Sequence, residues 1–322
     1  MPYIFVAAGL CLLLLGGESL VRGAVELAQR LGVSPLVIGL TIIAYGTSAP
    51  ELLVSLEANL AGSPGIAIGN VVGSNIANIL LIVGASAIIY PIACKGGGVN
   101  LNSIVLLTAT VLFFGLALSG SIESWAAFPM LGLLFGFTVY SYYAGRRNPG
   151  TAAALEAEGF ENGSKPLSRS LAVLAFGLVG VVLGSHLLVT GAVDLARSFG
   201  VSEATIGLTL VALGTSLPEL ATAVVAAYRR HPEVALGNVV GSNLFNTLGI
   251  MGVVPIFGAL PIPAPVIGFD FWVMLGATLV FVGWSAVCRS FGRALAALFL
   301  IAYVGYIACH YFGISAMPMG PV

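Results

Sequence analysis

The feature that most constrains this 322-residue chain is a pair of sequence blocks that occurs twice. GTSAPEL at Gly46–Leu52 returns as GTSLPEL at Gly214–Leu220, and GNVVGSNIAN at Gly69–Asn78 returns as GNVVGSNLFN at Gly237–Asn246. When the sequence is shifted by 168 positions, 24 of the 46 residues at positions 33–78 are identical, without a gap. Shared hydrophobicity alone does not produce this density of matches. The chain is therefore an internal duplication, and its halves should fold alike.

The composition indicates a membrane protein. Hydrophobic residues make up 58% of the chain and charged residues 8%, with a mean hydropathy of +1.05. A soluble globule of this size needs more polar surface, so we expect a polytopic protein in the lipid bilayer. The apolar run at residues 4–15 lacks a basic segment before it, which favours a first membrane span over a secretory signal. A net charge of -1 without any basic run argues against nucleic acid as a partner.

Stretches of about 20 apolar residues can cross a bilayer as helices. A single long polar stretch, residues 145–168, divides these stretches into two groups. We predict an all-α fold of ten membrane helices, with a first five-helix repeat over 1–144, a cytoplasmic linker over 145–168 and a second repeat over 169–322. Because each repeat has an odd number of spans, the second enters from the opposite side as an inverted repeat. The predicted spans are 3–29, 34–60, 65–91, 100–119, 122–144, 169–197, 202–228, 233–258, 266–287 and 293–312.

The basic residues predict the orientation, because lysine and arginine are enriched in cytoplasmic loops. With both termini outside a plasma (cell inner) membrane, ten of the twelve basic residues lie in or next to cytoplasmic connections, and only Arg197 is clearly external. The ten are Arg30, Lys95, Arg146, Arg147, Lys165, Arg169, Arg229, Arg230, Arg289 and Arg293.

The duplicated GTS-x-PE block predicts a membrane helix that is broken near its centre. Pro50 and Pro218 cannot donate a backbone hydrogen bond to the carbonyls four residues earlier, at Gly46 and Gly214. An opened turn at bilayer depth must be satisfied by protein, water or a ligand, and a bound cation can do this.

Polar side chains gather at the same two breaks. Glu51 and Glu219 lie inside apolar stretches, where a carboxylate is costly and marks a functional site by default. Hydroxyl groups three and four residues before each glutamate lie on the same helix face, and the next span of each half carries a polar stripe at i, i+4 and i+8. These hydroxyl and stripe residues are Thr47, Ser48, Thr215 and Ser216, then Asn70, Ser74, Asn78, Asn238, Ser242 and Asn246.

Carboxylate, amide, hydroxyl and backbone oxygens suit hard cations, and calcium accepts them in more flexible geometry than magnesium does. Two ionised glutamates neutralise one divalent ion or two monovalent ions, so one site could exchange one load for the other. We expect no cofactor. The four cysteines are scattered without ligand spacing and are expected to be free thiols: Cys11, Cys94, Cys288 and Cys309.

The two blocks, GTS-x-PE and GN-x-x-GSN-x-x-N, resemble the α-repeats of the calcium/cation antiporter superfamily, and in particular those of prokaryotic sodium/calcium exchangers. The resemblance implies electrogenic exchange of several sodium ions for one calcium ion by alternating access. It places shared calcium and sodium carboxylates at Glu51 and Glu219. The other implied cation ligands are Thr47, Ser48, Thr215, Ser216, Ser74, Ser242, Asn78 and Asn246. Potassium-dependent members carry an aspartate at one of the last two positions, so the asparagines here favour a potassium-independent exchanger.

Other polar residues have simpler interpretations. Asn75 and Asn243 lie one step off the stripe and are expected to make helix–helix hydrogen bonds, and the same caution applies to Asn70 and Asn238. Glu18 and His186 occupy equivalent positions in the two halves but differ in chemistry, which favours a peripheral role for both. Glu57 could line an access path or pack at an interface.

Calcium/proton antiport remains the main alternative, although the hydroxyl groups beside each glutamate favour sodium because protons need no such ligands. An intramembrane enzyme would use Ser48, Ser216 and His186, but catalysis needs one serine with a dedicated base rather than two symmetric copies. A passive channel is disfavoured, since two carboxylates would hold divalent ions too strongly for rapid exit. The expected partners are calcium, sodium and the bilayer. The oligomeric state is open, and a monomer suffices for transport.

Overall fold

The structure is a computed structural model that describes residues 2–93, 97–146, 166–199, 212–262, 266–288 and 290–312. Most of the predicted linker lies outside these residues, as do its acidic residues and the start of the predicted span 202–228. Lys95, Arg147, Lys165, Arg289 and Cys94 also lie outside them. The three described cysteines, Cys11, Cys288 and Cys309, are free thiols as expected.

The first half is helical apart from two short strands. Its elements are α1 (Pro2–Leu31), α2 (Pro35–Ile38), η1 (Gly39–Ile43), α3 (Ala44–Thr47), α4 (Ala49–Leu60), α5 (Pro64–Ala77), η2 (Asn78–Ile82), α6 (Val83–Ile89), β1 (Ile92–Ala93), α7 (Gly97–Ala117), β2 (Ser121–Ile122), η3 (Ser124–Ala126) and α8 (Ala127–Arg146).

The second half follows a similar order. Its elements are α10 (Leu167–Ser198), α12 (Ala212–Gly214), α13 (Leu217–Tyr228), α14 (Pro232–Leu244), η5 (Phe245–Ile250), α15 (Met251–Val253), η6 (Val254–Phe257), β3 (Leu260–Pro261), η7 (Val266–Asp270), α16 (Phe271–Val287), β4 (Ser290–Phe291) and α17 (Arg293–Tyr311).

The helices match the prediction of an all-helical membrane protein. Within the described ranges, seven helices are long and apolar enough to cross a bilayer, and the pair Pro35–Thr47 and Ala49–Leu60, bent by 41°, makes an eighth. Two of the ten predicted spans, 100–119 and 202–228, correspond to shorter described apolar helices, Leu101–Ala117 and Leu217–Tyr228. The count of ten therefore stays a prediction.

The two halves interlock by exchanging contacts. Strand β1 pairs antiparallel with β4, and β2 pairs antiparallel with β3, so each two-stranded sheet contains one strand from each half. The peripheral helices cross over in the same way, because α8 packs on η5 and α15 while α17 packs on η2 and α6. Neither half could keep these contacts alone, so we expect the halves to fold as one unit.

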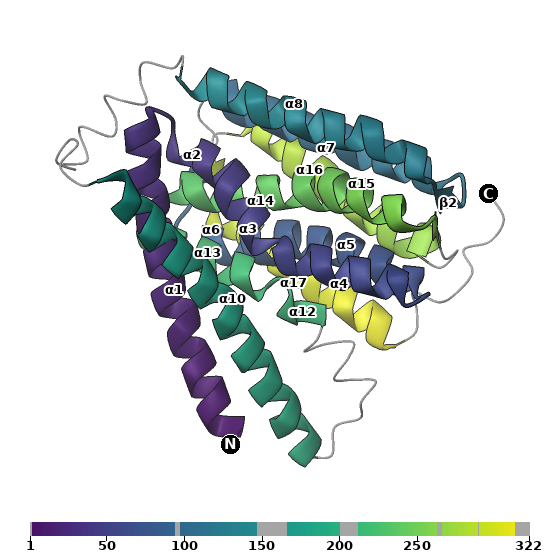
Figure 1. Ribbon diagram of the computed structural model, residues 1–322, viewed down its shortest axis with the longest axis horizontal. Helices are drawn as coiled ribbons and strands as arrows, with labels where there is room; N and C mark the ends of the chain where they lie inside the picture. The colour runs from purple at the N-terminus through teal and green to yellow at the C-terminus, as the bar shows by residue number, and fades with distance from the viewer. Residues whose placement is uncertain are drawn as a thin grey trace.

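Helices α1 and α10 lie side by side and diverge from the rest of the bundle toward the N-terminus of α1 (Figure 1). Glycines permit this close approach. A Cβ added at Gly16 would lie 2.6 Å from the backbone nitrogen of Val181, and one added at Gly184 would lie 2.7 Å from that of Leu13. Gly177 would likewise meet the backbone of Leu20. This seam of small residues joins the first helix of each half into one pair.

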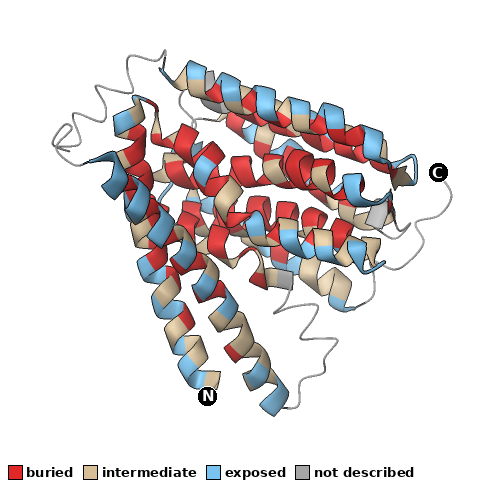
Figure 2. Ribbon diagram, in the orientation of Figure 1, coloured by how far each residue is buried: buried red, intermediate tan, exposed pale blue. Residues whose placement is uncertain are grey.

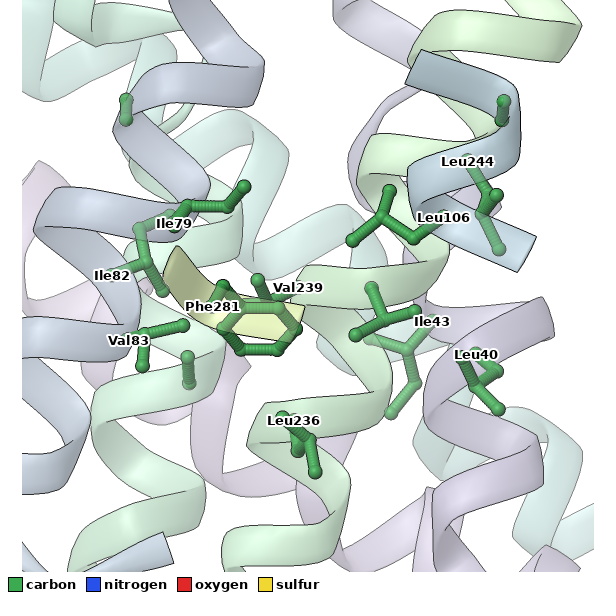
Figure 3. Close-up of a cluster of buried hydrophobic side chains, with 14 of the residues drawn as sticks. Leu40, Ile43, Ile79, Ile82, Val83, Leu106, Leu236, Val239, Leu244 and Phe281 are labelled. Carbon is green, nitrogen blue, oxygen red and sulfur yellow. The ribbon is translucent and has the colours of Figure 1, made fainter. Parts of the chain in front are cut away.

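The most buried helices lie in the middle of the molecule, where α5, α14 and the segments after them are largely enclosed (Figure 2). A close-up of the core shows Ile79 and Ile82 from the first half near Val239, Leu236 and Phe281 from the second (Figure 3). Large apolar side chains on the outer helices remain exposed, as lipid contact requires: Phe128, Phe135, Ile301 and Val304.

The glycine seam can be tested by adding one methyl group. Gly177→Ala should lower the thermal stability of the purified protein, with a loss of about 1–3 kcal/mol, because the backbone of Leu20 must move. Gly136→Ala is the matched control, since nothing lies within 4 Å of a Cβ added at that helical glycine. Equal melting temperatures for the two variants would contradict the close packing of α1 on α10.

Candidate cation site

The predicted helix break is present in both halves and has the same backbone conformation in each. Between α3 and α4 the chain turns at Ser48, with φ -87° and ψ 5°, and before α13 it turns at Ser216, with φ -86° and ψ 2°. Pro50 and Pro218 occupy the first turn of the helix that follows each serine. The proline prediction of a broken helix is thus confirmed.

The breaks bring the two carboxylates into the centre of the protein. Glu51 is 1% exposed and Glu219 0%, and each lies in the first turn of its helix, where the backbone N–H groups point toward the carboxylate. The Ser48 hydroxyl donates a hydrogen bond of 2.7 Å to Oε1 of Glu219. In the mirrored relation, the hydroxyls of Ser216 and Thr215 are neighbours of the Glu51 carboxylate. Each glutamate carboxylate thus lies beside hydroxyl groups from the broken helix of the other half.

Asn70 and Asn238 position the backbone of these glutamates. Asn70 Nδ2 donates to the carbonyl of Glu51 at 3.1 Å, and Asn238 Nδ2 donates to the carbonyl of Glu219 at 3.4 Å. Their Oδ1 atoms accept from the opposite half, since Thr215 Oγ1 lies 3.4 Å from Asn70 and Thr47 Oγ1 lies 3.3 Å from Asn238. These contacts agree with the expected structural role of both asparagines.

One of the two carbonyls that proline leaves without a backbone donor is satisfied by the protein itself. The Ser185 hydroxyl on α10 donates 2.6 Å to the carbonyl of Gly214. This carbonyl is therefore satisfied by the protein, one of the ways in which the opened turn was expected to be satisfied. Gly17 occupies the repeat position of Ser185 and has no side chain to offer Gly46. No sequence pattern indicated Ser185, because the contact depends on how α10 packs.

The last asparagines of the two polar stripes, Asn78 and Asn246, have different surroundings. Asn78 Nδ2 donates to Asn243 Oδ1 at 2.9 Å, and Asn75 Nδ2 donates to Thr247 Oγ1 at 2.8 Å. These bonds agree with the expected helix–helix role of Asn75 and Asn243. Asn246 is fully buried, yet neither polar atom of its side chain has a hydrogen-bond partner. Its amide is therefore available to a ligand.

Two π-helical segments occur here, η2 starting at Asn78 and η5 containing Asn246. The α-helical pattern of the sequence did not predict them. Such turns are frequent at functional sites.

The central side chains provide oxygen atoms that could bind a cation. Ser74 is buried and accepts a hydrogen bond of 3.2 Å from the Ser216 hydroxyl, so these two predicted ligands lie together. In the part of the chain that the structure describes, no group of three or more His, Cys, Asp or Glu side chains could hold a metal ion. The centre thus offers hard oxygen ligands and two carboxylates, which suits calcium and sodium. The buried oxygens without a hydrogen-bond partner in this region are Glu51 Oε2, Glu219 Oε2, Asn75 Oδ1, Asn78 Oδ1, Ser242 Oγ and Asn246 Oδ1.

A cavity of about 350 Å³ lies next to this centre. Its wall includes Thr215 and both prolines of the breaks, together with Val54 on α4 and His186 on α10. It therefore reaches both helix breaks at their prolines. His186 lines the cavity, while Glu18, at the equivalent position, forms an ion pair of 2.6 Å with Arg229. Both lie away from the central oxygens, which agrees with the peripheral role expected for them.

Both halves of the chain match one known protein family. The family model described as sodium/calcium exchanger protein matches residues 1–143 and 169–312. The chain belongs to the sodium/calcium exchanger family. Its relatives and structural neighbours are transporters, so this exchanger is a membrane cation/calcium antiporter and not an enzyme. The interpretation as an intramembrane serine enzyme is wrong.

Similar proteins cover nearly the whole exchanger. The putative antiporter CaxA of Alkalimonas amylolytica is 38% identical over 307 residues, which span 94% of this chain and 96% of that protein. The sodium/calcium exchanger MaX1 of Methanosarcina acetivorans is 31% identical over 344 residues, 96% of this chain and 98% of that protein. A structure of the sodium-calcium exchanger NCX_Mj, soaked with 10 mM Na⁺ and 10 mM Sr²⁺, matches with a TM-score of 0.84 and 33% identity over 95% of this chain and 97% of that one.

Neutralising either carboxylate should remove calcium binding. We expect Glu51→Gln and Glu219→Gln to weaken Ca²⁺ binding at least about 100-fold, because each keeps the side-chain shape and removes half of the compensating charge in a water-poor site. Isothermal titration of the purified exchanger measures this. Glu123→Gln is the matched control, because this glutamate is exposed and its carboxylate accepts a hydrogen bond from Ser121. Near-normal Ca²⁺ binding in either variant would contradict a calcium site that uses both carboxylates.

Adding a third carboxylate should change ion dependence. Asn246→Asp places a negative charge where the amide lacks a hydrogen-bond partner, so a proton or an extra monovalent cation should bind with it. Calcium flux into proteoliposomes should then become more dependent on pH or on potassium. Asn243→Asp, one step off the polar stripe, provides the comparison. Unchanged pH and potassium dependence in Asn246→Asp would mean that this side chain does not face the ions.

Proposed function

We propose that this exchanger moves sodium against calcium by alternating access, without a cofactor. The single observation that carries the proposal is the pair of buried carboxylates, Glu51 and Glu219, one from each half and each beside hydroxyl groups of the other. Two carboxylates match the charge of one calcium ion. The neutral oxygens around them supply further ligands that sodium needs and protons do not.

The proposed ligand set is the one expected from the sequence. Glu51 and Glu219 are shared by calcium and sodium, and the hydroxyl and amide oxygens complete the coordination of each ion. The burial and the short distances among these residues support their grouping. The set is Thr47, Ser48, Glu51, Ser74, Asn78, Thr215, Ser216, Glu219, Ser242 and Asn246.

We assign the chain ten membrane spans in two inverted repeats, residues 1–144 and 169–322, joined by a cytoplasmic linker. The exchange of strands and peripheral helices between the halves supports this topology. With both termini outside the plasma (cell inner) membrane, α4 and α10 end on the external side. The cavity between these helices then serves external access, and a single chain contains the whole path.

Proteoliposomes test the coupling ion directly. Vesicles loaded with sodium, with potassium or with an acid interior are diluted into calcium, and uptake is measured. Uptake in sodium-loaded vesicles alone is the expected result. Uptake driven by the acid interior without sodium would replace the proposal with calcium/proton antiport.

The proposed coupling is three sodium ions per calcium. The calcium-loaded site is neutral when only Glu51 and Glu219 are ionised, and so is a site with two sodium ions. A third sodium ion, held by neutral oxygens, leaves one positive charge to cross the membrane field. A potential of 100 mV is then worth about 2.3 kcal/mol, close to fiftyfold in the transport equilibrium.

Voltage dependence measures this coupling. Liposomes clamped with valinomycin and potassium should show a reversal point of sodium-driven calcium flux that moves with the potential. The same liposomes with calcium on both sides and no sodium are the control for leak. A reversal point that does not move would mean two sodium ions per calcium, and the electrogenic assignment would have to be withdrawn.

A further inference from the structure

The two halves are not equivalent where their first helices meet the broken helices. On one side α1 packs closely along α13: a Cβ added at Gly17 would lie 3.1 Å from the side chain of Val225 and 3.5 Å from the carbonyl of Ala221. On the other side, α10 and α4 make few contacts, and the 350 Å³ cavity lies between them. The structure is therefore closed at the α1–α13 contact and open at the α10–α4 contact.

Equivalent residues show the same difference. Thr222 on α13 is fully buried, whereas Val54, its repeat position on α4, is 37% exposed and lines the cavity. In an inverted repeat, closing the second side requires α10 to approach α4 as α1 approaches α13. The balance between the two access states then depends on which contact is the more stable.

An ion pair stabilises the closed contact. Nε of Arg229, directly after α13, donates to Oε2 of Glu18 on α1 at 2.6 Å. The repeat positions carry His186 in place of Glu18 and Ala61 in place of Arg229, so the same pair cannot form between α10 and α4. Ala61 is uncharged and cannot form an ion pair with any residue of α10.

The open contact is also chemically less suited to closing. Glu57 occupies the repeat position of Val225, and Ser185 that of Gly17. If α10 closes on α4, the Glu57 carboxylate must pack against α10. At the equivalent contact on the other side, Gly17 packs against Val225. Burial of a carboxylate disfavours that closure.

We propose that the Glu18–Arg229 ion pair is a latch that holds the α1–α10 pair against α13 and so favours the state in which the cavity beside α4 is open. The proposal rests on the alternating access of the proposed function but not on which ion drives transport. The two contacts thus have unequal roles: the ion pair lies at the α1–α13 contact, and the open cavity lies between α4 and α10.

Opening the latch should shift the balance by about two- to fivefold, the range of a partly exposed ion pair. Glu18→Gln and Arg229→Gln remove the pair with little change in shape. Arg230→Gln is the matched control, because it removes the same charge from the neighbouring position of the same turn. The exchange of charges in Glu18→Arg/Arg229→Glu should restore the pair.

Two reporter cysteines measure the balance. In a background whose native cysteines are replaced, Val54→Cys reports the open cavity and Thr222→Cys the closed contact. Both are labelled with a maleimide in the purified full-length protein without calcium or sodium, so neither an ion gradient nor membrane orientation enters the result. Opening the latch should slow labelling at position 54 and speed it at position 222, so that the ratio of the two rates falls two- to fivefold. The charge exchange should restore the ratio, and Arg230→Gln should leave it unchanged.

Two results would overturn the latch. One is a labelling ratio in both single variants that stays equal to that of the parent. The other is a ratio that falls in the charge exchange as far as in the single variants, although all elute as folded protein in size-exclusion chromatography. If a single variant does not fold, the charge exchange alone decides, since a folded protein with the parent ratio requires the pair. Failure of the proposed function is a separate result: calcium uptake driven by an acid interior without sodium would contradict sodium/calcium exchange and would not change the labelling ratios expected here.

Discussion

The structure depends on a constraint of electrostatics: two carboxylates lie buried together, and the four duplicated blocks contain no lysine or arginine to neutralise them. Two such charges in a water-poor interior are stable only with compensating positive charge. The protein provides partial compensation through hydroxyl groups, such as Ser48 on Glu219, and through the helix N-termini that carry both glutamates. The remainder must come from a mobile ion, so the same feature that destabilises the empty centre gives it affinity for cations. An exchanger needs this incomplete compensation, because carboxylates whose charge was fully compensated by the protein would have little affinity for a cation.

The duplication provides the geometry for that centre. Neither half contains a complete set of contacts, because the hydroxyl groups beside each glutamate and the acceptors of Thr47 and Thr215 come from the other half. The same exchange occurs at the periphery, where β1 pairs with β4 and β2 with β3. A change in the ion bound at one carboxylate therefore directly affects hydroxyl groups of the opposite half. This is a physical basis for coupling the occupancy of the centre to the relative position of the halves.

The sequence predicted those parts of the structure that depend on local chemistry. The breaks follow from Pro50 and Pro218, and the burial of Glu51 and Glu219 follows from their apolar surroundings; all of these appear as expected. Contacts set by helix packing could not be predicted. The hydroxyl of Ser185 caps Gly214, and Asn78 pairs with Asn243, because particular helix faces meet at particular depths. The count of ten spans rests on apolar length, and two of the described helices are too short to test it.

The π-helical turns at Asn78 and Asn246 have a consequence for how this fold can vary. A π turn holds one residue more than an α turn, so the helix beyond it is rotated by about 100° relative to an uninterrupted helix. The face that α6 presents to α17 is thus set separately from the face that α5 presents to the carboxylates. Loss of one residue within Ile79–Ile82 would rotate α6 while leaving Ser74 and Asn78 in register. The scaffold can therefore change its outer packing by single-residue insertions or deletions while the chemistry at its centre stays constant.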